Sequence, residues 1–244
     1  MSTERLVAGA LAEDVELSGD LGALDAEGCR LVDCRLVGAT AAGGHAPRSS
    51  WRGTRLEQVR FAGVGLARST WLDVTIERSS LAGCELYGAQ WRRVTVTDSV
   101  LDSLNLREAR LRDVRFTDCV LRHLDLGSAR LSDVVLSGCR VVRLTLPHAV
   151  LTRVDLRGSQ LDVLDGVDAL RGATIDLDQL VTLAPVMAAH LGLKVVAPGE
   201  PVDAFFARAK VPVPTPRSLE ATMVATGTEA EVQPALAVVN IVYL

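Results

Sequence analysis

The chain has 244 residues, of which 48% are apolar, only 4% are aromatic and 23% are charged. This composition excludes a chain that is disordered throughout, and the length allows one large domain or two ordinary ones. The formal net charge of −4 and a pI of about 5.6 argue against a nucleic-acid binder. The low aromatic content indicates a narrow interior built from mid-sized aliphatic side chains.

The first residues do not have the pattern of an export signal. Met1–Gly19 carries Glu4, Glu13, Asp14 and Glu16 and lacks an unbroken apolar core. No stretch approaches eighteen uncharged apolar residues, so no membrane span is expected. Five cysteines are an odd number and lie far apart, which favours reduced thiols. We therefore expect a cytoplasmic protein.

A period of five residues runs through the middle of the chain. Every fifth residue is apolar at 23 consecutive positions, and we call these positions centres. A second phase, two residues before each centre, holds small or aliphatic residues and repeats the order Ala, Val, Ser or Cys, and Leu every twenty residues. The centres are Trp51, Leu56, Phe61, Leu66, Trp71, Ile76, Leu81, Leu86, Trp91, Val96, Leu101, Leu106, Leu111, Phe116, Leu121, Leu126, Leu131, Leu136, Val141, Leu146, Leu151, Leu156 and Leu161.

This period predicts a stack of square coils. Five residues per unit fit neither the helical period of 3.6 nor the strand period of two. Two inward positions in five suit a short extended piece followed by a tight corner, and four such sides close a coil of twenty residues. Stacking places residue n over residue n + 20 at the parallel-strand spacing of about 4.8 Å. Such a stack has apolar open ends and needs caps.

The unit small–x–Leu–x–x, as in Ala109–Asp113 and Ala129–Asp133, resembles the pentapeptide-repeat proteins. The resemblance covers about residues 19–165. It implies an all-β fold, a right-handed quadrilateral parallel β-helix, to which the sequence adds a C-terminal capping α-helix. The stretch Leu170–Ile175 resembles the C-terminal closure of actinobacterial-type members of the family.

We expect four parts along the chain. Residues 1–18 form an N-terminal cap or irregular segment, in which Leu6–Glu16 is either a short helix or an irregular cap. Residues 19–165 form the β-helix, with a protruding or irregular coil at Gly38–Ser50 because Gly43–Pro47 is typical of a loop. Residues 166–194 form a helical cap, and residues 195–244 form a Pro-rich linker and a tail.

The helical cap has start and stop signals. Asp176 with Gln179 three residues later predicts a capping box, and Gly192 predicts the C-cap. Pro185 should kink the helix or split it. One apolar face should cover the last coil, and its residues are Leu180, Leu183, Val186, Met187 and Leu191.

Cysteines and tryptophans of the repeat are expected in the core. All five cysteines fall in the small inward phase, and their spacings of 5, 50, 35 and 20 residues supply no zinc knuckle. We therefore expect no metal site, no cofactor and no catalytic thiol. The tryptophans stand at centres, where a large ring is a core residue. The cysteines are Cys29, Cys34, Cys84, Cys119 and Cys139.

A Ser–His pair on the outer surface is the one candidate for catalysis. His123 should lie one coil above Ser103, beside Asp102, and His148 lies over Ser128 in the same way. A convex wall supplies neither a substrate pocket nor oxyanion donors, so we interpret these side chains as solvated surface residues and expect no enzyme.

Charge decides between the remaining functions. Residues 51–165 carry 17 arginines against 14 acidic residues, a net charge of +3. The side of the coil with centres Trp51 to Leu151 is basic, and we call it the basic face. Its arginines are Arg52, Arg92, Arg93, Arg110, Arg112, Arg130 and Arg153.

We predict a non-catalytic solenoid that acts as a rigid protein-interaction module, with the basic face as its binding face. The alternative comes from the family resemblance: some pentapeptide-repeat proteins inhibit or protect DNA gyrase by resembling B-form DNA. That mimicry needs a strongly acidic rod, which the net charge of +3 disfavours. The partner is expected to be a protein, a topoisomerase by resemblance only, with no direct nucleic acid and no membrane. Whether the chain forms a homodimer stays open.

Overall fold

The computed structural model describes residues 6–195. All of these except Val195 belong to one compact unit, Met1–Lys194, and a second unit comprises Val195–Leu244. Apart from Val195, the linker and tail predicted for residues 195–244 therefore lie outside the described residues, as do residues 1–5 of the predicted N-terminal segment.

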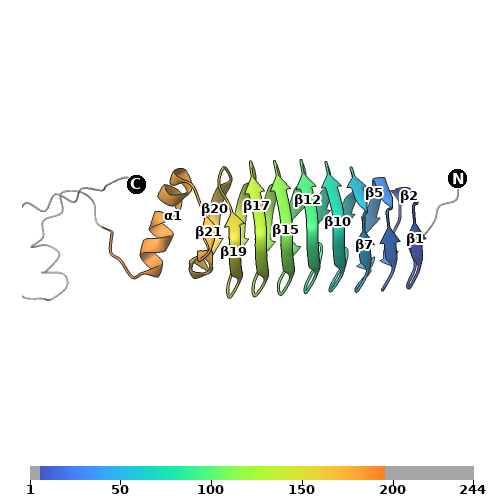
Figure 1. Cartoon of the computed structure of the whole chain (residues 1–244), viewed down its shortest axis with the longest axis horizontal. Helices are drawn as coiled ribbons and strands as arrows, with labels where there is room; N and C mark the ends of the chain where they lie inside the picture. The colour runs from blue at the N-terminus through green and yellow to red at the C-terminus, as the bar shows by residue number, and fades with distance from the viewer. Residues whose placement is uncertain (1–5, 196–244) are drawn as a thin grey trace, which may run out of the picture. The chain divides into compact units, whose positions relative to one another are not determined.

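Short parallel strands in successive coils make up most of the first unit (Figure 1). A 3-10 helix, η1 (Val167–Leu170), and one α-helix, α1 (Leu177–His190), follow the last full coil. The strands are β1 (Leu11–Glu13), β2 (Glu16–Asp20), β3 (Leu24–Asp25), β4 (Arg30–Val32), β5 (Arg35–Ala42), β6 (Gly44–His45), β7 (Ser50–Arg52), β8 (Arg55–Glu57), β9 (Arg60–Ala62), β10 (Thr70–Glu77), β11 (Ser80–Ala82), β12 (Gln90–Thr97), β13 (Val100–Asp102), β14 (Leu104–Asn105), β15 (Arg110–Thr117), β16 (Val120–Asp125), β17 (Arg130–Ser137), β18 (Arg140–Thr145), β19 (Val150–Asp155), β20 (Gln160–Asp165) and β21 (Ala173–Thr174).

The register between coils is twenty residues. Trp71 pairs with Trp91 across β10 and β12, and Leu111 pairs with Leu131 across β15 and β17. Every centre from Trp51 to Leu161 is buried. The predicted fold class is confirmed: the chain forms a right-handed quadrilateral parallel β-helix with a C-terminal helix.

The corners need residues in the left-handed backbone region. Asp133, at one corner, has a φ of 57°, and Gly83, at another, has a φ of 60°. Tight corners of this kind leave a backbone N–H without a partner in the parallel ladder, and a buried N–H needs an acceptor. The coil meets this need in two ways.

At one corner the turn closes on itself. Ala109 N–H donates to the carbonyl of Leu106, so a small apolar residue suffices there. At another corner the next coil supplies the acceptor. Val59 N–H donates to Ser79 Oγ at 3.1 Å, and Ser79 N–H donates to Ser99 Oγ at 3.0 Å. Further along this column Cys139 N–H donates to Ser159 Oγ. This is why Ser or Cys recurs in this column every twenty residues.

The coil at Gly38–Ser50 is regular, so the predicted protrusion is wrong. β5 continues to Ala42, β6 pairs with β3, and both Ala41 and Ala46 are buried. Ala41 pairs in register with Phe61 of the next coil. Gly44, with a φ of 83°, lies so close to Leu24 that a Cβ atom would overlap the Leu24 backbone. The glycine therefore marks close strand packing rather than a loop.

The N-terminal segment is also more regular than expected. β1 and β2 lie within residues 11–20, so no helix forms over Leu6–Glu16, and the coil begins before residue 19. Ala12 pairs with Leu31, an offset of nineteen residues, and an irregularity between Ser18 and Asp20 restores the offset of twenty. One missing residue hides the period in the sequence at this end.

Helix α1 has the predicted ends. Asp176 accepts from Gln179 N–H at 2.9 Å, and the Gln179 side chain accepts from Asp176 N–H. At the other end Leu193 N–H donates to Ala188 and Gly192 N–H to Ala189. The C-cap residue is therefore Leu191, and the predicted Gly192 is the left-handed residue directly after it, as in a Schellman motif. The helix is not split at Pro185. The carbonyl that loses its donor belongs to Val181, an exposed residue, so water can satisfy it.

The buried face of α1 differs from the prediction. Only Leu183 of the predicted apolar residues is buried, and Met187 is half-buried, whereas Leu180, Val186 and Leu191 are exposed. The helix turns Gln179 toward the coil instead, because its amide donates to the carbonyls of Leu156 and Ser159. The hydrogen bonds from Gln179 to these carbonyls of the last coil therefore determine which face of the helix is buried.

Candidate interaction face

The basic face is the outer surface of the strands that carry the centres Trp51 to Leu151. Each strand places a centre inward and its two neighbours outward, and a corner residue follows. Arg110 and Arg130 precede their centres, Arg52, Arg92 and Arg112 follow theirs, and Arg93 and Arg153 stand at the corner. All seven side chains are exposed.

Two of the seven arginines are neutralised within the coil. Arg93 binds Asp73 of the preceding coil through Nε–Oδ1 at 2.5 Å and Nη2–Oδ2 at 2.8 Å. Arg153 binds Asp133 in the same way, at 2.6 and 2.8 Å. The hydrogen bonds from these guanidinium groups lower the pKa of both aspartates. Both pairs span twenty residues, so the period of the sequence could have revealed them.

Four of the other arginines stand side by side. Arg92 is in register with Arg112, and Arg110 is in register with Arg130. Within residues 6–195, none of these four makes an ion pair with a carboxylate, and neither does Arg52. We call Arg92, Arg110, Arg112 and Arg130 the arginine cluster.

Arginines on other sides of the coil differ from one another. Each of four exposed arginines contacts a carboxylate at 2.6 to 3.3 Å, whereas Arg55, Arg60 and Arg68 are exposed and make no such contact within residues 6–195. The arginine cluster is distinguished by its register, in which both arginines of each neighbouring pair lack a carboxylate partner among the described residues. The four pairs are Arg122–Asp102, Arg140–Asp162, Arg143–Asp165 and Arg157–Asp155.

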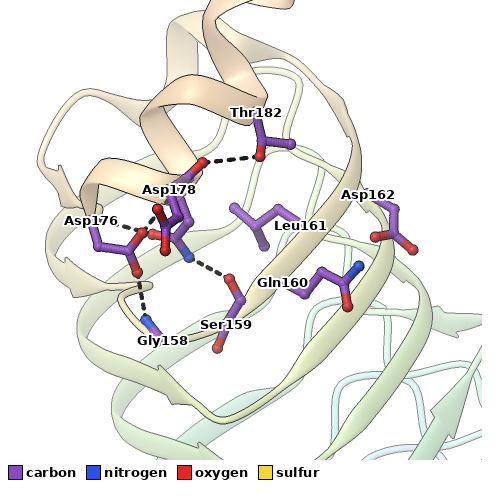
Figure 2. A pocket seen from close by; sticks show the side chains of 9 residues that line it. Gly158, Ser159, Gln160, Leu161, Asp162, Asp176, Asp178 and Thr182 are labelled. Carbon is purple, nitrogen blue, oxygen red and sulfur yellow. Dashed lines mark hydrogen bonds between the residues drawn. The ribbon is translucent and has the colours of Figure 1, made fainter.

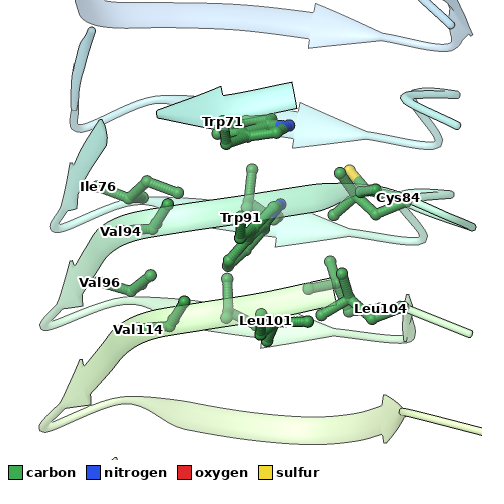
Figure 3. Close-up of a cluster of buried hydrophobic side chains, with 14 of the residues drawn as sticks. Trp71, Ile76, Cys84, Trp91, Val94, Val96, Leu101, Leu104 and Val114 are labelled. Carbon is green, nitrogen blue, oxygen red and sulfur yellow. The ribbon is translucent and has the colours of Figure 1, made fainter. Parts of the chain in front are cut away.

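Stacked tryptophans lie beneath the N-terminal part of the basic face (Figure 3). The ring centroids of Trp51 and Trp71 are 4.9 Å apart with an interplanar angle of 8°, and those of Trp71 and Trp91 are 5.6 Å apart at 40°. Large rings packed in this way make the wall stiff, because any movement of the strands would open space in the core. The predicted core role of the tryptophans is confirmed.

The indole N–H groups differ along the stack. Those of Trp51 and Trp71 donate to Ser49 and Ser69, each two residues earlier, at 2.9 and 2.7 Å. The Nε1 of Trp91 is buried and has no acceptor among the described residues, because Ala89 stands where the other two coils have serine.

The five cysteines are all buried and unpaired, as predicted for small core residues. Burial raises the pKa of the Cys29 and Cys84 thiols to about 11. The contact with Cys139 in the next coil, together with burial, raises the pKa of Cys119. A raised pKa keeps the thiols of Cys29, Cys84 and Cys119 protonated, whereas the hydrogen bond with Cys119 lowers the pKa of Cys139.

The Ser–His pair does not form a catalytic arrangement. The Ser103 hydroxyl donates to Asp102 at 3.0 Å, and Asp102 binds Arg122. His123 pairs in register with Arg143, and no hydrogen bond joins it to Ser103 in the described part of the chain. Within residues 6–195, no three His, Cys, Asp or Glu side chains gather in a way that could hold a metal ion. The same residues include no helix long and apolar enough to cross a membrane.

Residues 89–165 match the family model described as the pentapeptide repeat region. This stretch, which covers the arginine cluster, is therefore built of pentapeptide repeats. No curated protein matches the chain.

The solved structures that are similar over most of the chain include those of two proteins with known roles. One is QnrB1, a plasmid-mediated fluoroquinolone resistance protein, at 14% identity and a TM-score of 0.37, covering 77% of this chain and 99% of that chain. The other is HetL from the cyanobacterium Nostoc, a pentapeptide repeat protein involved in heterocyst differentiation regulation, at 16% identity and a TM-score of 0.26, covering 70% and 92%. The strand register defines the fold independently of these likenesses.

Proposed function

We propose that the coil is a rigid, non-catalytic interaction module whose basic face binds an acidic surface of a partner protein. The observation that carries this proposal is the arginine cluster, in which like charges are stacked in register and none makes an ion pair within residues 6–195. Like charges directly opposite on neighbouring strands are unfavourable. Carboxylates of a partner would relieve this repulsion.

The dimensions of the face favour an extended partner over a small ligand. The seven arginines run from the coil of Trp51 to that of Leu151, which at the parallel-strand spacing of about 4.8 Å is a stripe roughly 24 Å long. The stacked coils fix the backbone positions of these side chains, so that binding has to order the arginine side chains but not the backbone.

The test is charge reversal in the arginine cluster. The variant Arg92→Glu, Arg110→Glu, Arg112→Glu and Arg130→Glu is compared with a matched control, Arg122→Glu, Arg140→Glu, Arg143→Glu and Arg157→Glu. Both change the net charge by the same amount. With a glutamate-rich peptide as the probe, we expect cluster reversal to weaken salt-sensitive binding at least about tenfold and the control to weaken it less than about threefold. Equal loss in both variants would refute the proposal.

The same variant tests the alternative of a gyrase-directed DNA mimic. Reversal makes the coil more acidic, so mimicry predicts stronger inhibition of gyrase supercoiling by the cluster variant. Binding through the basic face predicts no gain. The resemblance of Leu170–Ile175 to the C-terminal closure of actinobacterial-type members stays a prediction, and neither experiment depends on it.

A further inference from the structure

A groove of about 530 Å³ lies between the last coil and the first turns of α1 (Figure 2). Gly158–Asp162 lines it from the coil, and Asp176, Asp178, Gln179 and Thr182 line it from the helix side. No residue of the arginine cluster lines the groove, and the charged side chains that do line it are acidic.

The coil side of the groove is an open strand edge. One edge of β20 pairs with β18, where Gln160 is in register with Arg140 and Gln160 N–H donates to the carbonyl of Cys139. Successive residues of a parallel strand direct their backbone groups to opposite edges. The N–H and C=O of Leu161 are therefore directed at the outer edge, where no backbone hydrogen bond from another described element reaches them.

The rest of the last coil is closed. β21 pairs with β19, the Gln179 amide binds the carbonyls of Leu156 and Ser159, and Gly158 N–H donates to Asp176 at 2.8 Å. Such closure is the normal protection of a solenoid end. The outer edge of β20 is therefore unpaired among the described residues, and the groove lies beside it.

The charge of the groove is negative. Asp162, Asp176 and Asp178 line it, and no lysine or arginine does. Arg140 contacts Asp162 from outside the lining at 3.3 Å, and Asp176 caps the helix and has its pKa lowered in part by the charge of Arg157. Asp178 is exposed and makes no ion pair within residues 6–195. A basic occupant is complementary to this set.

The geometry points to a docking site for an extended basic segment of a partner protein, added as one further strand on β20. Its backbone would pair with Leu161. Its alternate side chains would lie over Leu161 on one side and beside Asp162 on the other, because side chains of a strand alternate between faces. A segment with alternating basic and apolar residues fits both.

Charge argues against a second copy of this chain as the occupant. The opposite open end of the coil carries Glu13, Asp14, Glu16 and Asp20, all exposed. Stacking that end on the acidic groove would bring like charges together, so a head-to-tail assembly is disfavoured.

The test uses the full chain and an acetylated six-residue peptide of alternating lysine and valine. Three comparisons define the site. One is a peptide with the same sequence that is N-methylated at each lysine, so that the edge carrying the lysine N–H groups cannot donate to β20. The second is the chain with Asp162→Lys and Asp178→Lys. The third is the chain with Asp168→Lys, an exposed acidic residue of η1 outside the groove, as a single-site control for the change of charge.

We expect the unmodified peptide to bind and to slow hydrogen exchange at the Leu161 amide. N-methylation and the double variant should each weaken binding at least about tenfold, and Asp168→Lys less than about twofold. Three results would each overturn the proposal: binding that is unchanged by N-methylation, equal loss with Asp168→Lys, or self-association of the chain that the double variant abolishes.

Discussion

The coils of residues 51–96 and those of residues 111–156 share one backbone and one register but are filled differently. The first set, the tryptophan coils, stacks Trp51, Trp71 and Trp91 in its interior. The second set, the leucine coils, has Leu111, Leu131 and Leu151 in the same column and encloses an apolar cavity of about 20 Å³. The corner conformations and the hydrogen bonds between coils therefore determine the path of the backbone. The volume of the inward side chains determines how tightly the interior is packed.

The largest effect should come from a charge in the interior of the leucine coils. Leu121→Asp buries an unpaired carboxylate and should lower the free energy of unfolding by about 3–5 kcal/mol. Arg122→Asp, at the exposed neighbouring position, should cost under about 1 kcal/mol. Thermal and denaturant unfolding measure both. Similar midpoints would mean that the inward and outward positions are wrongly assigned.

Converting one tryptophan coil to a leucine coil should have the next largest effect. Trp71→Leu removes the ring that stacks on Trp51 and leaves the Ser69 hydroxyl without its indole donor. We expect a loss of about 2–3 kcal/mol, since removal of large buried side chains leaves cavities. A loss below about 1 kcal/mol in urea unfolding would show that the core of these coils is not tightly packed.

The same substitution should have opposite signs in the two sets. Leu131→Phe extends a side chain that lines the cavity and should stabilise the coil by about 0.5–1 kcal/mol. Leu86→Phe adds the same volume in a tryptophan coil and should destabilise by about 1–3 kcal/mol through overpacking. Equal effects would remove the distinction between the two interiors.

A smaller gain should come from Ala89→Ser. It places a hydroxyl two residues before Trp91, as Ser49 and Ser69 stand before their tryptophans, and gives the buried Nε1 an acceptor. We expect about 1 kcal/mol of stabilisation. The control is Ala109→Ser, which precedes Leu111 and has no indole to bind; it should not stabilise. A gain in both variants would point to a cause other than the indole.

The smallest effect concerns the surface, where both sets have the same ion pair. Arg93→Gln should return the pKa of Asp73 toward its ordinary value, and NMR titration of the carboxyl would detect the change. Asp73 has a depressed pKa in the folded state, so its contribution is present at neutral pH and is lost only as the pH falls below about 4. Because both groups are exposed, the stability should hardly change. An unchanged pKa would show that the pair does not persist in solution.

Much of this could be predicted from the sequence, because one strict period sets both the fold and the register. The buried centres, the cysteines and the capping box at Asp176 all followed from spacing. The irregular N-terminal coils did not, because the bulge near Ser18 interrupts the period and the small centres Ala41 and Ala46 resemble a loop.

The candidate sites were less predictable. The seven arginines were correctly placed on one side, but a count of charges did not separate the paired Arg93 and Arg153 from the arginine cluster. The groove at β20 depends on how α1 settles on the coil, and the orientation of α1 depends on the Gln179 amide. A glutamine at a helix start carries no such signal in the sequence.

The column of Val59, Ser79, Ser99, Cys119, Cys139 and Ser159 has a consequence for how such a chain changes length. Each corner N–H that depends on this column takes its acceptor from the following coil, so a coil is complete only when another follows it. Duplication or deletion of twenty residues leaves every donor with an acceptor. Between residues 59 and 159, a change of any other length shifts the acceptors off the column and leaves buried N–H donors without a partner; the offset of nineteen at the N-terminal end lies before this column. The molecule should therefore lengthen or shorten in evolution by whole coils, about 4.8 Å at a time.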